Sequence, residues 1–209
     1  MTTRAIFLDR DGTVNEEVGY LESLDRFKLF PGVPAAIARA NRAGVKVFVL
    51  TNQSGVGRGY FSIEFVQETH RHLQTLLKRE GAHLDGIYLC PHHPDDRCSC
   101  RKPEIRMMAD AAGEHGVDLS RSWVVGDKLI DMEMAHRAGA KGVLVLTGYG
   151  EEEIRKIPEA ESRETMSRPD HVARDLSEAI DLILNEWRRE TEEAGKVGDP
   201  ACIKKSRRV

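Results

Sequence analysis

The sequence predicts an α/β fold built on a doubly wound parallel sheet, and three observations support this. Short apolar runs alternate with segments whose apolar residues recur at helical spacing, which is typical of repeated strand–helix units. Several apolar runs end abruptly at acidic, hydroxyl or glycine residues, as parallel strands do where they face a ligand. The 209 residues, 40% hydrophobic and 31% charged, suit one globular domain rather than two.

The expected strands are short and apolar, and they occupy residues 5–8, 45–50, 87–89, 123–125 and 143–146, with an edge strand at 171–172. Helical periodicity between them predicts helices at residues 34–42, 62–81, 103–116, 132–138 and 177–187. Ser62 is a suitable N-cap, and Pro103 is a suitable first helical residue. Gly44, Gly81 and Gly139 are the expected helix stops.

These elements predict one domain at residues 1–190, followed by a disordered, basic-ended tail at 191–209. Apolar residues thin out from Arg188 onward, and four of the last six residues are basic. The segments between the first and second strands, and between the second and third, are too short for a large cap domain. We therefore expect an open site.

Charge and composition exclude some partner classes. A formal net charge of −3 gives no argument for a nucleic-acid or membrane partner. The sequence enters its first expected strand without a signal peptide, and no apolar run approaches the length of a membrane span. The prediction is a cytoplasmic monomer, in which Cys90, Cys98, Cys100 and Cys202 are reduced or metal-bound rather than paired in disulfides.

The chain is organised around its first strand end, where Asp9 and Asp11 follow an apolar run and Gly12 permits a sharp turn. Two carboxylates so close repel each other unless a cation or a shared proton relieves them. A calcium loop of the EF-hand type is excluded, because the glycine comes fourth from Asp9 and the twelfth residue is Tyr20. A plain Asx turn is the remaining structural alternative to a metal or proton-transfer site.

Two further strand ends favour the metal. Thr51 and Asp127 are expected at the same edge of the sheet as Asp9, and oxygen-only ligands suit Mg²⁺. Residues 51–55 offer a hydroxyl, amides and backbone N–H groups for an anionic oxygen, while Arg101 and Lys102 add positive charge. Each feature alone is weak, but together they predict a phosphoryl-transfer site.

A second cluster, Cys90, His92 or His93, Cys98 and Cys100, matches the ligand set of a tetrahedral zinc site. A disulfide between two of the three clustered cysteines would leave the third thiol unpaired, since Cys202 lies far away in the tail. Disulfides or free thiols remain the alternative. Four protein ligands leave no open position, so we expect a structural zinc that staples the loop at about 90–102. This staple would hold Arg101 and Lys102 over the site.

The ordered motifs resemble those of the haloacid dehalogenase (HAD) superfamily of phosphatases, across residues 4–150. They are residues 9–13, residues 51–52, Lys102 and residues 126–131. By this resemblance Asp9 is the nucleophile that forms an aspartyl-phosphate, Asp11 is the general acid/base, and Thr51 and Lys102 hold the phosphoryl oxygens. Asp9, Asp127 and the main-chain carbonyl of Asp11 would bind Mg²⁺. Because an unperturbed Asp is a poor proton donor at neutral pH, we also expect the site to shift the pKa of Asp11.

The cysteine loop, together with Arg101 and Lys102, resembles one HAD branch, the D-glycero-D-manno-heptose 1,7-bisphosphate 7-phosphatases, in which the first histidine binds zinc. The implied activity is Mg²⁺-dependent removal of the 7-phosphate in ADP-heptose, lipopolysaccharide-core or related nucleotide-heptose biosynthesis. The related histidinol-phosphate phosphatases carry a similar loop and are the alternative, and an inactive zinc-stapled binding module is a third reading. The expected substrate contacts are Glu17, Val18, Gly19, Tyr20, Asn52, Gln53, Ser54, Arg101 and Lys128.

Overall fold

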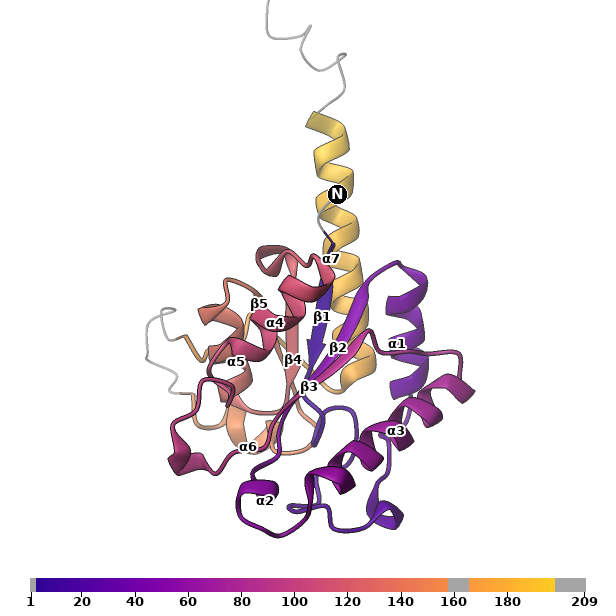
Figure 1. Ribbon diagram of the computed structural model, residues 1–209. Helices are drawn as coiled ribbons and strands as arrows, with labels where there is room; N and C mark the ends of the chain where they lie inside the picture. The colour runs from indigo at the N-terminus through magenta and orange to yellow at the C-terminus, as the bar shows by residue number, and fades with distance from the viewer. Residues whose placement is uncertain (1–2, 158–165, 198–209) are drawn as a thin grey trace, which may run out of the picture.

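The predicted parallel sheet is confirmed by the computed structural model, which describes residues 3–157 and 166–197 (Figure 1). Six strands lie in the order β3-β2-β1-β4-β5-β6, and every neighbouring pair is parallel. The strands are β1 (Ala5–Leu8), β2 (Lys46–Asn52), β3 (Gly86–Cys90), β4 (Trp123–Gly126), β5 (Lys141–Val145) and β6 (His171–Ala173). The central β1 lies between β2 and β4, so three of the polar strand ends predicted from the sequence come together at one edge of the sheet.

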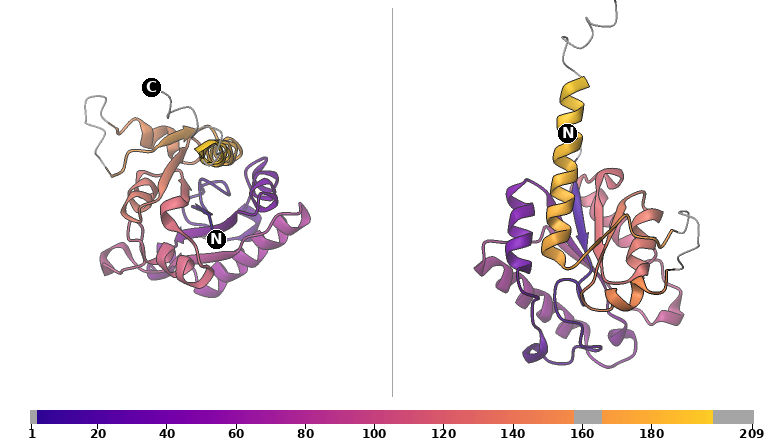
Figure 2. Two further views of the ribbon diagram at one scale, coloured as in Figure 1. Left: turned by 90° about the horizontal axis from the view of Figure 1, so that it is seen from above. Right: turned by 180° about the vertical axis from the view of Figure 1, so that it is seen from behind.

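Helices cover both faces of the sheet. The longer ones are α1 (Val33–Arg42), α3 (Ile63–Arg79), α4 (Arg106–His115), α5 (Leu129–Arg137) and α7 (Leu176–Val197). Single turns form α2 (Ser54–Gly57), α6 (Gly150–Ile154) and three 3₁₀ segments, Leu24–Arg26, Pro94–Asp96 and Leu119–Arg121. Helices α4 and α5 lie on the face seen in Figure 1, and α1 and α7 lie side by side on the opposite face in Figure 2.

Alternation of side chains along β1 builds two hydrophobic cores. Ile6 and Leu8 pack with residues of α1, α3 and α7, whereas Ala5 and Phe7 pack with residues of α4 and α5. All four side chains are completely buried, as expected for a central strand of a parallel sheet covered on both faces. The strand that ends at Asp9 is therefore held rigidly from both sides.

Three helix boundaries differ from the sequence prediction. Helix α4 begins at Arg106 rather than Pro103, because residues 101–104 form a turn in which Glu104 N donates to Arg101 O at 2.9 Å. Helix α5 begins at Leu129 rather than residue 132, because the Asp131 carboxylate accepts a hydrogen bond from Lys128 N, 3.3 Å away, in a capping box.

The last helix continues beyond the predicted end at Trp187 to Val197. Arginine and glutamate residues follow Trp187, and these are good helix formers even where no apolar stripe continues. The remainder of the predicted tail, including Cys202, lies outside the described residues.

The segments between β1 and β2 and between β2 and β3 are fully described, and their only helical elements are the first 3₁₀ turn, α1, α2 and α3. They contain no large cap domain, as the sequence predicts. Among the described residues, no helix is long and apolar enough to cross a membrane.

Candidate active site

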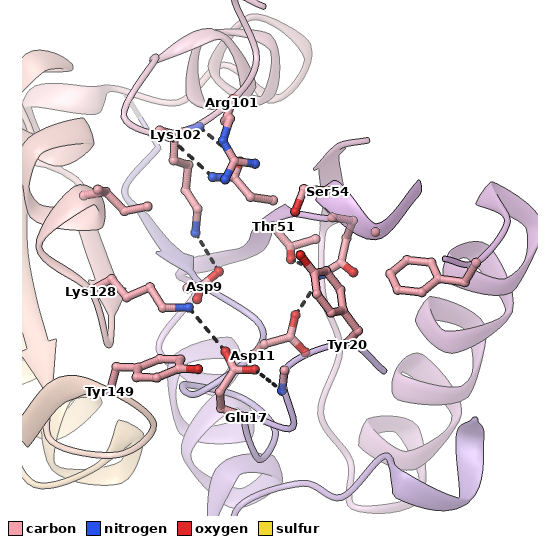
Figure 3. Close-up of a pocket in the computed structure, with 16 residues that line it drawn as sticks. Asp9, Asp11, Glu17, Tyr20, Thr51, Ser54, Arg101, Lys102, Lys128 and Tyr149 are labelled. Carbon is pink, nitrogen blue, oxygen red and sulfur yellow. Dashed lines mark hydrogen bonds and ion pairs between the residues drawn. The ribbon is translucent and has the colours of Figure 1, made fainter. Parts of the chain in front are cut away.

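A cavity of about 420 Å³ opens at the carboxyl ends of β1, β2 and β4 (Figure 3). It brings together most of the side chains that the sequence predicts for a phosphoryl-transfer site. From residues 9–51 these are Asp9, Asp11, Glu17, Gly19, Tyr20 and Thr51. From the rest they are Asn52, Gln53, Ser54, Arg101, Lys102 and Lys128. Val18, predicted to contact substrate, does not line the cavity and packs against the hydrophobic core instead.

Lys102 forms the electrostatic centre of the site. Its Nζ lies 2.6 Å from Asp9 Oδ1 and 2.7 Å from Asp131 Oδ1, and it donates to Leu50 O at 3.1 Å. Burial by itself lowers the pKa of a lysine, but the charges of Asp131 and Asp9 outweigh burial and raise the pKa of Lys102. The ammonium group is therefore a fixed positive charge beside Asp9.

The main chain of Lys102 is held by Asn52. Lys102 N donates to Asn52 Oδ1 at 3.1 Å, and Asn52 Nδ2 donates to Lys102 O at 3.4 Å. Asn52 lines the cavity, as predicted for a substrate contact, but its amide group is engaged in positioning Lys102. The second strand end thus fixes a residue that lies 50 positions later in the chain.

Asp9, Asp127 and Asp131 form a buried carboxylate cluster in which one oxygen of each lies within 4.8 Å of the others. Asp127 Oδ2 accepts a hydrogen bond from Tyr149 N at 2.9 Å, whereas Asp127 Oδ1 has no hydrogen-bond partner among the described residues. Burial and the charge of Asp9 raise the pKa of Asp127 to about 8. Burial raises the pKa of Asp131 to about 6, although Lys102 opposes the shift.

A divalent cation would neutralise these crowded, buried carboxylates and would bind the oxygen that has no hydrogen-bond partner. A donor set made only of oxygen atoms suits Mg²⁺. The donor set therefore fits the predicted magnesium. The carboxylate of Asp11 is not part of the cluster; the sequence prediction uses its main-chain carbonyl. Asp131 was not predicted as a site residue, although it lies within the motif at residues 126–131.

Two glycines make room for Asp127. Gly12 has φ +91°, and a Cβ atom there would lie 2.1 Å from Asp127 Oδ2. Gly148 has φ +57°, and a Cβ atom there would lie 2.2 Å from the same oxygen. Thr147 Oγ1 donates to Gly12 O at 2.6 Å and ties the two glycine turns together. Gly12, predicted to permit a sharp turn, also permits this close approach.

Asp11 is held by donors from three residues. Arg10 grips its carboxylate with Nε and Nη2 at 2.8–3.1 Å, Asn15 Nδ2 donates to Oδ1 at 2.9 Å, and Gln53 Nε2 donates to Oδ2 at 2.8 Å. Burial alone would raise the pKa of Asp11, but the charge of Arg10 and these hydrogen bonds lower it. This direction favours the ionised carboxylate and is opposite to the upward shift that a proton donor at neutral pH needs.

Gln53 connects Asp11 to the phosphoryl-binding strand end. Its Nε2 donates to Thr51 Oγ1 at 2.8 Å as well as to Asp11. Thr51 then accepts from Gln53 and retains its own hydroxyl proton for an oxygen in the cavity. Gln53 therefore fixes the spacing between the predicted phosphoryl contact and the predicted general acid/base.

The rim of the cavity carries both charged and aromatic side chains. Glu17 Oε2 lies 3.3 Å from Lys128 Nζ, and Lys128 Nζ lies 4.6 Å from the centre of the Tyr149 ring. Burial alone would lower the pKa of Lys128, but Asp127 and other acids outweigh burial and raise it. Arg101 Nη1 is buried without a hydrogen-bond partner among the described residues, although Arg101 lines the cavity. The rim thus adds the positive charges of Arg101 and Lys128 to those inside the cavity.

The predicted zinc ligands converge beside this rim. Cys100 Sγ lies 2.9 Å from Cys90 Sγ and 3.1 Å from His92 Nδ1, and Cys98 Sγ lies 3.4 Å from Cys90 Sγ. His93 is engaged elsewhere, because its Nδ1 accepts from Asp95 N at 3.2 Å. The three described cysteines are free, and the S₃N set fits tetrahedral Zn²⁺. The geometry thus selects His92 rather than His93.

Comparison with known proteins identifies the relatives of this chain. Residues 99–179 match the HAD-hydrolase-like family model. A D-glycero-D-manno-heptose-1,7-bisphosphate 7-phosphatase of Thermosynechococcus vestitus is 41% identical over 194 residues, covering 88% of this chain and 96% of the relative. A D-glycero-beta-D-manno-heptose-1,7-bisphosphate 7-phosphatase of Pseudomonas aeruginosa is 40% identical over 161 residues, covering 76% of this chain and 90% of the relative.

Among solved structures, the D,D-heptose 1,7-bisphosphate phosphatase of B. bronchiseptica, complexed with magnesium and phosphate, superposes with a TM-score of 0.77. It is 36% identical to this chain, and the superposition covers 88% of this chain and 99% of the other.

Proposed function

Because the chain belongs to the D-glycero-D-manno-heptose-1,7-bisphosphate 7-phosphatase family of HAD hydrolases, we propose that it removes the 7-phosphate of that sugar bisphosphate. The observation that carries the proposal is the convergence of Asp9 on Lys102, 2.6 Å away, beside a buried carboxylate cluster. The rim residues Arg101 and Lys128 suit a substrate that carries a second phosphate. In this proposal the protein is a cytoplasmic monomer that acts in nucleotide-heptose biosynthesis.

In the proposed mechanism Asp9 attacks the phosphorus atom and forms an aspartyl-phosphate, while Asp11 gives a proton to the departing sugar alkoxide. Asp11, now ionised, then takes a proton from the water that hydrolyses the acyl phosphate, which releases inorganic phosphate and regenerates Asp9. Lys102 and the Thr51 hydroxyl would hold the phosphoryl oxygens and stabilise their charge.

Mg²⁺, held by Asp9, Asp127 and the Asp11 main-chain carbonyl with Asp131 nearby, would offset the repulsion between an anionic nucleophile and an anionic phosphate. The low pKa of Asp11 in the free protein must rise before it can donate a proton. A bound phosphoryl dianion is a like charge and shifts the pKa of Asp11 upward, so substrate binding itself would prepare the acid.

The test compares rates of Mg²⁺-dependent hydrolysis of heptose 1,7-bisphosphate and histidinol phosphate. The proposal predicts faster turnover of the heptose bisphosphate. Faster hydrolysis of histidinol phosphate would assign the chain to histidine biosynthesis instead. No metal-dependent hydrolysis of either ester would favour the inactive zinc-stapled binding module.

Removing one zinc ligand is expected to lower activity without unfolding the sheet. The protein purified without chelator should contain about one zinc per chain, held by Cys90, His92, Cys98 and Cys100. Cys98→Ser should loosen the loop that carries Arg101 and Lys102, while Ser99→Ala, between two ligands, should change neither zinc content nor rate. Elemental analysis and phosphate release are the measurements. Zinc-free protein from such a preparation, or activity supported by Zn²⁺ alone, would contradict a structural zinc.

Arg101→Ala is expected to raise KM for heptose bisphosphate far more than for a small monophosphate ester. The guanidinium would donate to the phosphate that is not transferred, and losing one charge-assisted contact of ~1.5–3 kcal/mol lowers kcat/KM roughly 10- to 150-fold. Arg97→Ala, in the same loop, is the control. Equal losses on both substrates would show that Arg101 serves the transferred group or the fold.

A further inference from the structure

A buried arginine connects the predicted general acid/base to helix α3. Arg10 is only 2% exposed and grips both oxygens of Asp11 on one side of its guanidinium. On the other side, Arg10 Nη1 lies 3.3 Å from His70 Nε2. Because an arginine has only donors, His70 Nε2 must be the acceptor, and the proton of the neutral imidazole must be on Nδ1.

His70 occupies a position that helical periodicity assigns to the core. It lies on the face of α3 that also carries Val66, Leu73 and Leu77, and it is 7% exposed. Burial and the charge of Arg10 lower the pKa of His70 to about 4, so the ring is neutral at neutral pH. A histidine on an apolar face often only packs, but here a ring nitrogen faces a buried charge. Without that acceptor, a donor of a buried guanidinium would lose its partner.

The consequence of this contact lies at Asp11. Asn15 and Gln53 each donate one hydrogen bond to the carboxylate, and Gln53 also holds Thr51. The bidentate grip of Arg10 sets the plane of the carboxylate, because the fork of a guanidinium fixes orientation as well as distance. The orientation of Asp11 relative to the phosphoryl site thus depends on a guanidinium whose far side is anchored by His70.

We propose that His70 is a positioning residue for the general acid/base, acting through Arg10 on the Asp11 carboxylate. This rests on the role given to Asp11 in the proposed function. The affected step is the one in which the phosphorus–oxygen bond of the ester breaks, the Asp9–phosphorus bond forms, and Asp11 passes its proton to the leaving oxygen. A sugar alkoxide needs that proton, whereas p-nitrophenolate is stable enough to leave without it. Misplacing Asp11 therefore penalises the sugar ester selectively.

The experiment compares kcat/KM for heptose bisphosphate and p-nitrophenyl phosphate, both with Mg²⁺, in three variants. His70→Leu keeps most of the volume and removes the acceptor, His70→Gln keeps an acceptor, and His72→Leu is a matched change on the same helix. Full loss of general acid catalysis lowers rates ~10²–10⁴-fold, so partial misplacement in His70→Leu should penalise the sugar ester about tenfold more than the aryl ester. Gln should restore the ratio to within about threefold of the wild type, and His72→Leu should leave it unchanged.

A double-mutant cycle with Asp11→Asn separates positioning from a structural effect. Once the general acid is absent, adding His70→Leu should leave the ratio between the two esters unchanged. Equal losses of His70→Leu on both esters, no rescue by Gln, or a selective loss that persists beside Asp11→Asn would each overturn the positioning role. Wild-type protein that hydrolyses neither ester would instead overturn the proposed function.

Discussion

Replacing Asp9 by Asn is expected to abolish steady-state phosphatase activity, with a loss on the order of 10⁴-fold or more. The amide is a much weaker nucleophile and a poorer magnesium ligand than the carboxylate. Asp9 is also held firmly in place, because its N–H donates to Val125 O at 2.9 Å and its carboxylate pairs with Lys102. The measurement is phosphate release under saturating Mg²⁺ and substrate.

Asp110→Asn is the matched control, since Asp110 pairs with Arg106 on the exposed surface of α4. It should retain wild-type activity, and both variants should show the circular dichroism of the wild type. Wild-type protein quenched in acid during turnover should carry a phosphoryl group on Asp9, and the Asn variant should not. Appreciable steady-state turnover by Asp9→Asn would rule out a covalent aspartyl-phosphate.

Strands β1 to β5 were predictable because each contains a run of apolar residues that needs no information from elsewhere in the chain, whereas β6 is a three-residue edge strand that begins with an exposed histidine. The helix boundaries were less so. Pro103 is as acceptable in a turn as at a helix start, and only the packing of residues 101–104 decides between them. The continuation of α7 past Trp187 was missed because the prediction relied on an apolar stripe, whereas helix propensity alone extends an exposed helix.

Motifs at strand ends located Asp9, Asp11 and Thr51, because parallel strands deliver their carboxyl ends to one edge. Lys102 lies in a turn after the cysteine loop, and the family resemblance identified it. The residues that sequence reasoning missed act through tertiary contacts. In the sequence Asp131 has the position of a helix-capping residue, and only the structure shows Lys102 2.7 Å away. Arg10 has the position of a spacer between two aspartates, and only the structure shows its contact with His70. A polar residue within the apolar stripe of α3 was the one available signal for His70.

Lys102 is expected to stabilise the fold as well as to hold the phosphoryl group. It is 4% exposed and is the counter-charge of both Asp9 and Asp131. Lys102→Met keeps the length of the side chain but leaves two buried carboxylates uncompensated, so the free energy of unfolding of the metal-free protein at pH 7 should fall by about 3–5 kcal/mol. Chemical denaturation in the presence of a chelator measures this loss.

Three comparisons determine whether charge is the cause. Mg²⁺ should restore more stability to Lys102→Met than it adds to the wild type, because a cation neutralises the same carboxylates. Burial already raises the pKa of Asp131 to about 6, and removing Lys102, which opposes that rise, raises it further above the unfolded value. The folded variant then takes up protons as the pH falls, and its deficit should shrink between pH 8 and pH 5.5. Lys46→Met removes the partner of Asp85 from a pair of 2.9 Å that is part-exposed, and it should change stability by less than about 1 kcal/mol. If the loss of unfolding free energy in Lys102→Met depended on neither Mg²⁺ nor pH, lost packing rather than unpaired charge would be the cause of the destabilisation.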